Sequence, residues 1–309
     1  MQVSRVGQKS QTPGPAPPSP DELRSRRHTP MRRFLRRFAR HRLGLIGAVV
    51  LSLTILTALA APWLAAYDPN KTNMELINGP PSWEHVLGHD ELGRDISARI
   101  LYGARVSLAV GMVAVSIYTV IGVLLGSISG YIGGRVDELI QRFTEIIMCF
   151  PSFMLIMTVV VVLKPSIFNI MIIIGLFGWT DIVRLVRGQI LSLRERDYVV
   201  AARMVGQGEW TILFKHVLPG TISPIVVRAT LGLSGAIMVE SGLSFLGIGV
   251  QAPQASWGSM LTTAMSLPVL ESKPWRWLPP AVALATVVLA VNFIGDALRD
   301  ALDPLTSEY

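Results

Sequence analysis

Cysteine and charged side chains are scarce in this chain. Its 309 residues include one cysteine, Cys149, and only 16% are Asp, Glu, Lys or Arg. A single cysteine excludes an internal disulfide framework and any metal site built from several cysteines. Few charges together with 50% apolar residues exclude a disordered chain, which needs low hydrophobicity and high charge. What remains is a membrane protein or an unusually apolar soluble one.

The motifs of common enzymes are also missing. None of the five lysines follows a glycine, so the nucleotide-binding loop G-x-x-x-x-G-K-[ST] is excluded, and neither G-x-S-x-G nor H-E-x-x-H occurs. We therefore expect no catalytic residues, no cofactor and no enzyme activity. The basic residues are mostly arginines, and they are not spread over the chain in the way that a surface for reading nucleic acid requires. We therefore expect no nucleic-acid partner.

One histidine cluster precedes the second apolar stretch. His85 and His89 stand there with Asp90 and Glu91. Two histidines four residues apart suit a metal ion on a rigid helix, but these lie in a predicted loop, so we expect no metal site. Cys149 is expected to be a small buried apolar residue rather than a reactive thiol.

Charged residues separate six stretches of membrane length. A transmembrane helix needs about 20 apolar residues, and the candidates are residues 43–65, 107–131, 149–163 with the preceding turn, 167–186, 222–246 and 278–295. The fourth requires Asp181 near one interface, and the fifth requires that Arg228 and Glu240 face protein or water. The alternative, a soluble bundle, does not need six such stretches. We predict an all-α integral membrane protein with six transmembrane helices.

The distribution of Lys and Arg predicts the orientation. If the amino terminus lies inside, 20 of the 28 Lys and Arg residues fall on the cytoplasmic side, and eleven of them precede the first span. Cytoplasmic loops are enriched in these residues. The chain is therefore predicted to be a multi-pass protein in contact with membrane lipid, with both termini cytoplasmic. Residues 1–42 form a basic, partly disordered tail in this interpretation.

The long loop between the fourth and fifth spans is amphipathic. Tyr198, Ala201, Ala202 and Val205 follow one another at i, i+3, i+4 and i+7, which forms an apolar stripe on a helix. Gly206 is expected to end or bend this helix. The chain then returns to the membrane at residues 216–219, with Pro219 in a first helical turn. Such a helix either lies on lipid headgroups or docks a soluble partner.

Ala201-Ala202, Gly206, His216 and Leu218-Pro219 have the spacing of a known loop. This spacing resembles the "EAA" loop of binding-protein-dependent ABC importer permeases. Residues 85–108, 245–261 and 292–304 resemble segments of the dipeptide and oligopeptide branch of that family. One departure is Val200, which stands where the loop of the family has its acid.

The resemblance implies a type I ABC importer (MetI-like) permease fold. It assigns 43–66 to the first transmembrane helix, 67–104 to an extracytoplasmic loop, 105–297 to the transmembrane domain, 187–218 to the cytoplasmic coupling loop within it, and 298–309 to a cytoplasmic tail. The residues implied to couple to the ATPase are Tyr198, Ala201, Ala202, Arg203, Gly206, His216, Leu218 and Pro219.

The resemblance also implies an activity and its partners. The chain would be a permease subunit of an ATP-driven importer that moves dipeptides or oligopeptides across the cytoplasmic membrane of a prokaryote by alternating access. Its partners would be a second permease subunit in a heterodimer, two cytosolic ABC ATPase subunits and an extracytoplasmic solute-binding protein. The absence of an ATP-binding motif agrees with an energy source on another chain.

Two further sets of residues within the spans are candidates for function. Gly122, Gly126, Gly130 and Gly134 recur every four residues, as in a ridge for close helix contact, which we assign to packing within the chain rather than to a subunit interface. Arg228 and Glu240 lie about 18 Å apart along one predicted helix and cannot pair with each other. Both are candidates to line the translocation path.

Other functions remain open from the sequence. Within the same family the solute could be nickel or another small molecule instead of a peptide. From different classes, an ATP-independent secondary transporter, a channel, or a scaffold for a complex would also fit six spans. Co-purification of an ATPase subunit would separate the importer from the transporter and the channel.

Overall fold

The computed structural model of the protein describes residues 30–302. The predicted disordered segment before residue 30 and the end of the predicted tail, 303–309, lie outside the described residues. Within them, all regular structure is helical apart from one isolated β-bridge between His89 and Asp95.

The helices follow one another without a sheet in the part of the chain that the structure describes. In order they are α2 (Pro30–Phe38), α3 (Arg42–Leu59), α4 (Ala61–Leu64), η1 (Met74–Leu76), α5 (Ile96–Ile132), α6 (Gly134–Met148), α7 (Ser152–Leu163), α8 (Ile167–Phe177), α9 (Thr180–Leu193), α10 (Asp197–Met204), α11 (Glu209–Ile212), η2 (Leu213–Val217), η3 (Leu218–Thr221), α12 (Ile222–Phe245), α13 (Trp257–Leu261), η4 (Thr262–Met265), α14 (Leu267–Ser272) and α15 (Pro274–Leu302).

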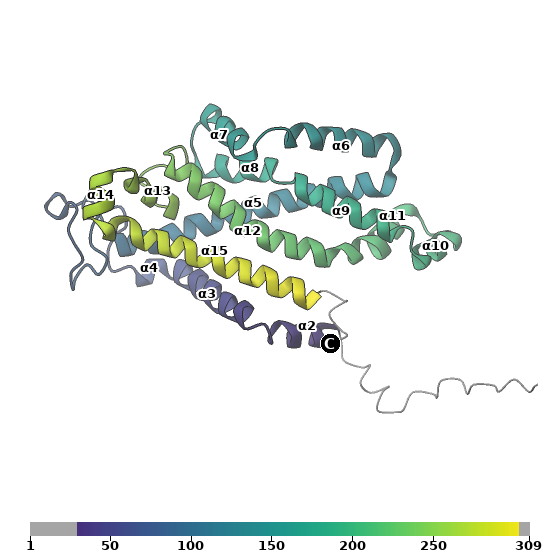
Figure 1. The fold of residues 1–309 in the computed structure, drawn as a ribbon, viewed down its shortest axis with the longest axis horizontal. Helices are drawn as coiled ribbons and strands as arrows, with labels where there is room; N and C mark the ends of the chain where they lie inside the picture. Colours follow the sequence, from purple (N-terminus) through teal and green to yellow (C-terminus); the bar gives the residue numbers. More distant parts are fainter. Residues whose placement is uncertain (1–29, 303–309) are drawn as a thin grey trace, which may run out of the picture.

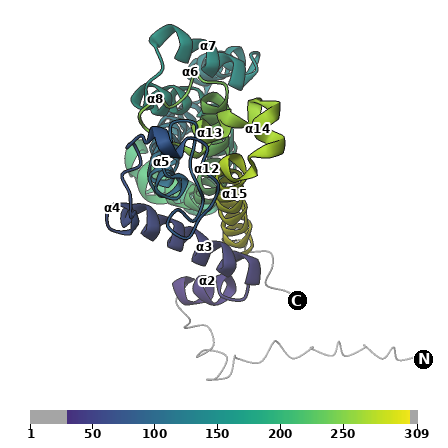
Figure 2. The same cartoon turned by 90° about the vertical axis from the view of Figure 1, so that its left-hand side faces the viewer.

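The long helices lie side by side in an elongated bundle with two different ends (Figure 1). Helices α10 and α11 form one end, called here the α10 end. Helices α13 and α14 lie at the other, the α14 end, beside the loop that connects α4 to α5 (Figures 1 and 2). Helix α2 and the last turn of α15 both lie toward the α10 end. The first and last described residues are therefore on the same side of the bundle.

Helix α5 is the centre of the bundle. Its 37 residues span about 55 Å, and it packs against α8, α9 and α12, while α15 packs against α3 and α12. The Asp95 side chain caps its first turn by accepting a hydrogen bond from the Ala98 amide, and Gly133 ends the helix. Val110 and Ala114 are fully buried midway along it, because neighbouring helices cover this helix on several sides.

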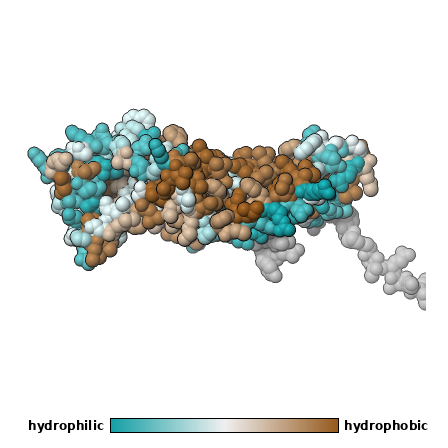
Figure 3. All heavy atoms as spheres, turned by 90° about the horizontal axis from the view of Figure 1, so that it is seen from above, coloured by the Kyte–Doolittle hydropathy of each residue, from teal (hydrophilic) through white to brown (hydrophobic). Residues whose placement is uncertain are grey.

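On the face that Figure 3 shows, the middle of the molecule is mostly apolar and the two ends are mostly hydrophilic. Five helical segments of the described chain are long and apolar enough to cross a membrane: Arg42–Leu59, Ile96–Ile132, Ile167–Leu193, Glu209–Phe245 and Pro274–Leu302. A sixth span results if α6 and α7, which are bent by 82° relative to each other, are counted together. These elements correspond to the six predicted stretches.

The third predicted span differs most from the expectation. Residues 149–163 are not one helix with a preceding turn, because the chain breaks at residues 149–151 and α7 has only 12 residues. Pro151 explains the break, since a proline cannot donate the backbone hydrogen bond that would continue α6. Cys149 lies at this break and is exposed, so the expectation that it is buried was wrong.

Candidate functional site

The loop between α9 and α12 protrudes at the α10 end of the bundle (Figure 1). Helix α10 begins at Asp197 and ends at Met204, and Gly206 then turns the chain with φ +77°. Glycine adopts this left-handed conformation without strain, which explains why the helix ends there. The chain continues through α11, the π-helical turn η2 and the 3-10 turn η3, where Pro219 occupies a first turn as predicted.

One face of α10 is fixed on the bundle. Val199 and Ala202 are buried and belong to the same apolar cluster as Val186 and Ile190 of α9. Ile212, Leu213 and Val217 from the later part of the loop join this cluster. The predicted stripe is therefore divided between two faces. Ala202 faces the bundle, whereas Tyr198, Ala201 and Val205 are exposed.

Several large apolar side chains of the loop are exposed to solvent among its polar residues. Met204 is 82% exposed and Val205 is 76% exposed. Further large apolar side chains exposed in the loop are Tyr198, Val200, Trp210 and Phe214. Large apolar side chains exposed in one protruding loop are typical of a site for a protein or a membrane.

Solvent-exposed polar contacts also hold the loop in place. Glu209 accepts a hydrogen bond from Arg203 Nε at 3.3 Å, and it also contacts the hydroxyl of Tyr131 at the end of α5. His216 Nε2 lies 2.9 Å from Oε1 of Gln207. These contacts tie the turn after α10 to both α5 and η2. Arg203 and His216 are in the loop as predicted, whereas their partners and Tyr131 are apparent only from the structure.

The two predicted intramembrane charges have different surroundings. Arg228 pairs with Asp181 of α9, so its partner comes from the neighbouring helix. Glu240 has no exposed surface. Its carboxylate accepts hydrogen bonds from Ser107 Oγ at 3.1 Å and from Ser244 Oγ at 2.7 Å. Their assignment to a translocation path stays a prediction.

The predicted glycine ridge lies against α9. A Cβ atom at Gly122 would lie 2.5 Å from Cβ of Ile182, one at Gly126 would lie 2.8 Å from the Val183 carbonyl oxygen, and one at Gly130 would lie 3.0 Å from the Arg187 carbonyl oxygen. Three of the four glycines therefore pack within the chain. Gly134 has no such neighbour within 4 Å.

The loop before α5 contains a compact group of charges at the α14 end. Asp90 Oδ2 lies 2.7 Å from Arg94 Nε and 3.4 Å from Arg99 Nε, and all three side chains are at most 10% exposed. Glu91 pairs with the buried Arg276. Asp90 and Glu91 are thus paired with arginines, and neither belongs to the group of side chains that could hold a metal ion.

A third carboxylate joins the histidines instead. His85, His89 and Asp95 each offer a ligand atom, and these atoms lie within 4.8 Å of one another. Burial would raise the pKa of Asp95, but hydrogen bonds from Ser97, the Ala98 amide and His85 outweigh it and keep this pKa below its usual value. Burial, together with the charge of His85, lowers the pKa of His89. One sequence signal could have drawn attention to this third residue: Asp95 directly precedes α5 and caps its first turn.

Known proteins resemble this chain over most of its length. Residues 122–308 match the family described as binding-protein-dependent transport system inner membrane component, and residues 29–81 match the N-terminal TM domain of oligopeptide transport permease C. A putative peptide permease protein of Brucella ovis is 42% identical over 275 residues, which cover 89% of this chain and 91% of that protein.

Two further relatives carry more specific names. The oligopeptide transport system permease protein OppC of Bacillus subtilis is 41% identical over 268 residues, 87% of each chain. The dipeptide transport system permease protein DppC of Alkalihalophilus pseudofirmus is 40% identical over 293 residues, 95% of each chain. The match therefore extends over the α10 loop as well as the helices around it.

Proposed function

Because the chain belongs to the family of inner membrane components of binding-protein-dependent transport systems, we propose that it is one membrane subunit of an ATP-driven importer of dipeptides or oligopeptides. The names of the relatives support peptides as the substrate class. The observation that carries the proposal is the α10 loop, whose outer face presents exposed Met204 and Val205 beside a helix bundle. No ATP-binding motif occurs in the chain, so hydrolysis is assigned to another subunit.

The proposed assembly contains this chain, a second permease subunit, two cytosolic ABC ATPases and an extracytoplasmic solute-binding protein. The excess of Lys and Arg in the segments at the α10 end supports a cytoplasmic position for that end and for both termini. The α14 end then faces the solute-binding protein.

Helix α10 is the proposed docking element for an ATPase. Tyr198, Ala201 and Val205 form its outward face, and the small Ala201 lets another backbone approach closely. The opposite face, with Val199 and Ala202, is buried in the apolar cluster that also contains residues of α9 and η2. A partner that moves α10 would therefore move α9 with it, and α5 through the contact of Tyr131 with Glu209. Rigid-body movement of this kind would convert closure of the ATPases into alternating access.

A matched pair of variants at Gly206 tests the docking. Gly206 has no atom within 4 Å of the position of a Cβ, so the first side-chain atom of either variant meets no obstacle within the described chain. Both Gly206→Ala and Gly206→Trp place an L-residue at φ +77°, which costs about 1–2 kcal/mol in each. Only tryptophan adds bulk to the proposed contact surface. We expect at least about 10-fold less ATP-driven peptide uptake in Gly206→Trp than in Gly206→Ala.

The assay uses the complete transporter in proteoliposomes, with a labelled dipeptide and with nickel as separate substrates. Membrane content of both variants is checked by immunoblot, and retention of the ATPase on the purified permease is measured in parallel. Equal uptake by the two variants would refute docking through this surface. ATP-independent uptake, or uptake of nickel in preference to peptide, would refute the proposed energy source or substrate.

A further inference from the structure

His89 is a buried side chain that lacks a hydrogen-bond partner for its ring. The residue is 3% exposed, and neither ring nitrogen has a partner within the described residues. A neutral imidazole has one donor and one acceptor, and buried polar atoms in folded proteins nearly always find partners. Leaving both unpaired costs free energy, so this ring indicates a group that the protein alone does not supply.

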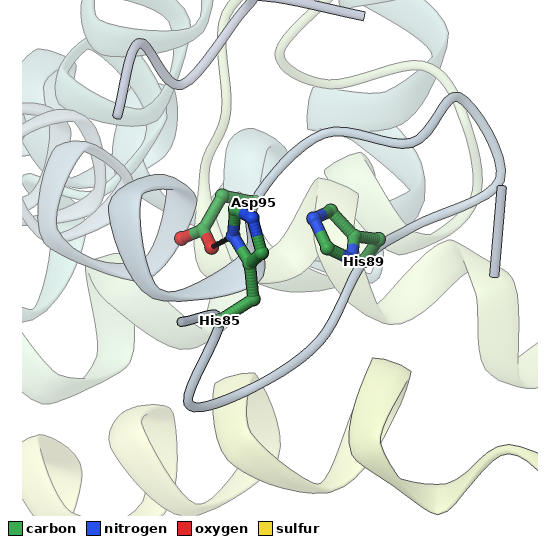
Figure 4. A group of neighbouring side chains, drawn as sticks. All are labelled: His85, His89 and Asp95. Atoms are coloured by element: carbon green, nitrogen blue, oxygen red, sulfur yellow. Dashed lines mark hydrogen bonds and ion pairs between the residues drawn. The ribbon is translucent and has the colours of Figure 1, made fainter. Parts of the chain in front are cut away.

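The ring of His89 lies next to two other metal-ligating side chains. Its centroid is 4.1 Å from that of His85, and His85 Nδ1 is 2.8 Å from Asp95 Oδ2. Figure 4 shows a nitrogen of the His89 ring directed toward His85 and Asp95. The three potential ligand atoms already lie within 4.8 Å of one another. Tetrahedral coordination of zinc at its usual bond lengths needs about 3.4 Å between ligand atoms, so the hydrogen-bonded pair would move slightly apart and the more distant atoms would move closer together.

The backbone holds two of these residues together. His89 and Asp95 form the antiparallel β-bridge, and the Ile96 amide donates to the Gly88 carbonyl oxygen at 3.0 Å. Asp95 uses its other oxygen, Oδ1, to accept from the Ala98 amide at 2.8 Å and from Ser97. Hydrogen bonds of this kind orient a metal-binding carboxylate and leave Oδ2 available. The arrangement therefore replaces the rigid helix that sequence analysis found lacking.

We propose that His85, His89 and Asp95 bind one divalent transition-metal ion, with Zn²⁺ as the representative of the class. Two imidazole nitrogens and one carboxylate oxygen suit zinc and its first-row neighbours better than Mg²⁺ or Ca²⁺, which prefer oxygen ligands. The fourth position is left for water. On binding, bonds from the metal to His85 and Asp95 replace their hydrogen bond, and any proton held between them is released to solvent. His85, whose side chain is 15% exposed, is the side of the site open to solvent.

The bound ion would fasten the loop to the first turn of α5. His85 and His89 come from the loop, whereas Asp95 caps the helix that runs through the whole bundle. The proposed metal site is independent of the transport function, because Zn²⁺ binding can be measured on the isolated chain.

The test is Zn²⁺ binding by the purified full chain, stripped with EDTA and prepared without a histidine tag. We expect one ion per chain by elemental analysis. His89→Gln and Asp95→Asn should each weaken Zn²⁺ binding by at least about 10-fold in competition titrations. Asparagine is a good N-cap, so Asp95→Asn preserves the start of α5 and keeps the comparison informative if His89→Gln fails to fold.

The matched control is His41→Asn. It also removes one histidine, but at the start of α3, where His41 caps the helix through the Gly44 amide at 3.0 Å and asparagine can replace that cap. Equal Zn²⁺ affinity of the wild-type chain, His89→Gln and Asp95→Asn would overturn the proposal, as would an equal loss in His41→Asn. X-ray absorption of the zinc-loaded wild type gives an independent check, and a spectrum without imidazole ligands would refute the site.

Discussion

The two polar loops at opposite ends of the bundle are held in different ways. At the α14 end the loop before α5 is fixed by buried ion pairs, since Asp90 contacts Arg94 and Arg99 out of solvent. At the α10 end the ion pair between Arg203 and Glu209 is exposed. The loop is fixed there by the buried apolar cluster that contains Val199 and Ala202. A buried pair is strongly destabilising to break, whereas an exposed pair contributes little. The first loop is therefore a rigid frame, and the second is a surface that a partner can engage.

The largest expected effect comes from removing the charge of Asp90. Asp90→Asn keeps an oxygen for the Leu92 and Arg94 amides, which Oδ1 now accepts at 2.9 Å and 3.0 Å. It leaves the buried Arg99 without a carboxylate and the buried Arg94 with only Glu91, 3.6 Å away, so we expect a loss of about 3–5 kcal/mol in the free energy of unfolding. The measurement is denaturant unfolding of the purified chain in mixed micelles.

Glu84→Gln is the control for this loss. Glu84 lies in the same loop and is exposed, so removing its charge should change stability by less than about 0.5 kcal/mol. If both variants lost the same stability, the proposal that buried ion pairs make the loop before α5 a rigid frame would be wrong.

A smaller effect is expected in the helix that joins the two loops. Helix α5 is capped by Asp95 and reaches past Tyr131, which contacts the α10 loop. Gly126→Ala would press its Cβ to 2.8 Å from the Val183 carbonyl oxygen of α9. Overpacking of this kind costs about 1–3 kcal/mol.

Gly188→Ala, on α9, is the control, because it makes the same glycine-to-alanine change at a position without a close contact. Gly188 has no atom within 4 Å of the position of a Cβ, so alanine there should stabilise the helix by about 0.5–1 kcal/mol. Opposite signs for the two substitutions in thermal unfolding would support the close packing of α5 on α9. Equal signs would contradict it.

Much of the fold could be predicted because lipid demands long apolar helices. The positions of the charged residues predicted all six membrane segments. The helix α10 was predicted from the spacing of its apolar residues and from Gly206 after it. The starts of helices were less predictable. Helix α5 begins at Ile96 rather than near residue 107, because Arg99 pairs with Asp90 within the protein instead of ending the helix in solvent.

The site was predictable only where its residues are close in sequence. The apolar stripe of α10 was evident, but its division into a buried and an exposed face depends on contacts with α9 and η2. Likewise the ion pair between Arg228 and Asp181 could not be predicted, since the two residues lie 47 positions apart in the sequence, on neighbouring helices. Asp95 was not grouped with the histidines because a backbone bridge, rather than helical spacing, brings it to His89.

The smallest expected change in stability distinguishes the two faces of α10. Val205 is 76% exposed, so Val205→Ala should alter the free energy of unfolding by less than about 0.5 kcal/mol. Val199, on the same helix, is fully buried, and Val199→Ala should cost about 2 kcal/mol. Retention of the ATPase by the purified permease should show the opposite order, with the greater loss in Val205→Ala, because only Val205 can reach a partner. A Val205→Ala chain that lost stability like Val199→Ala, or that retained the ATPase fully, would show that this face serves the chain itself and not a partner.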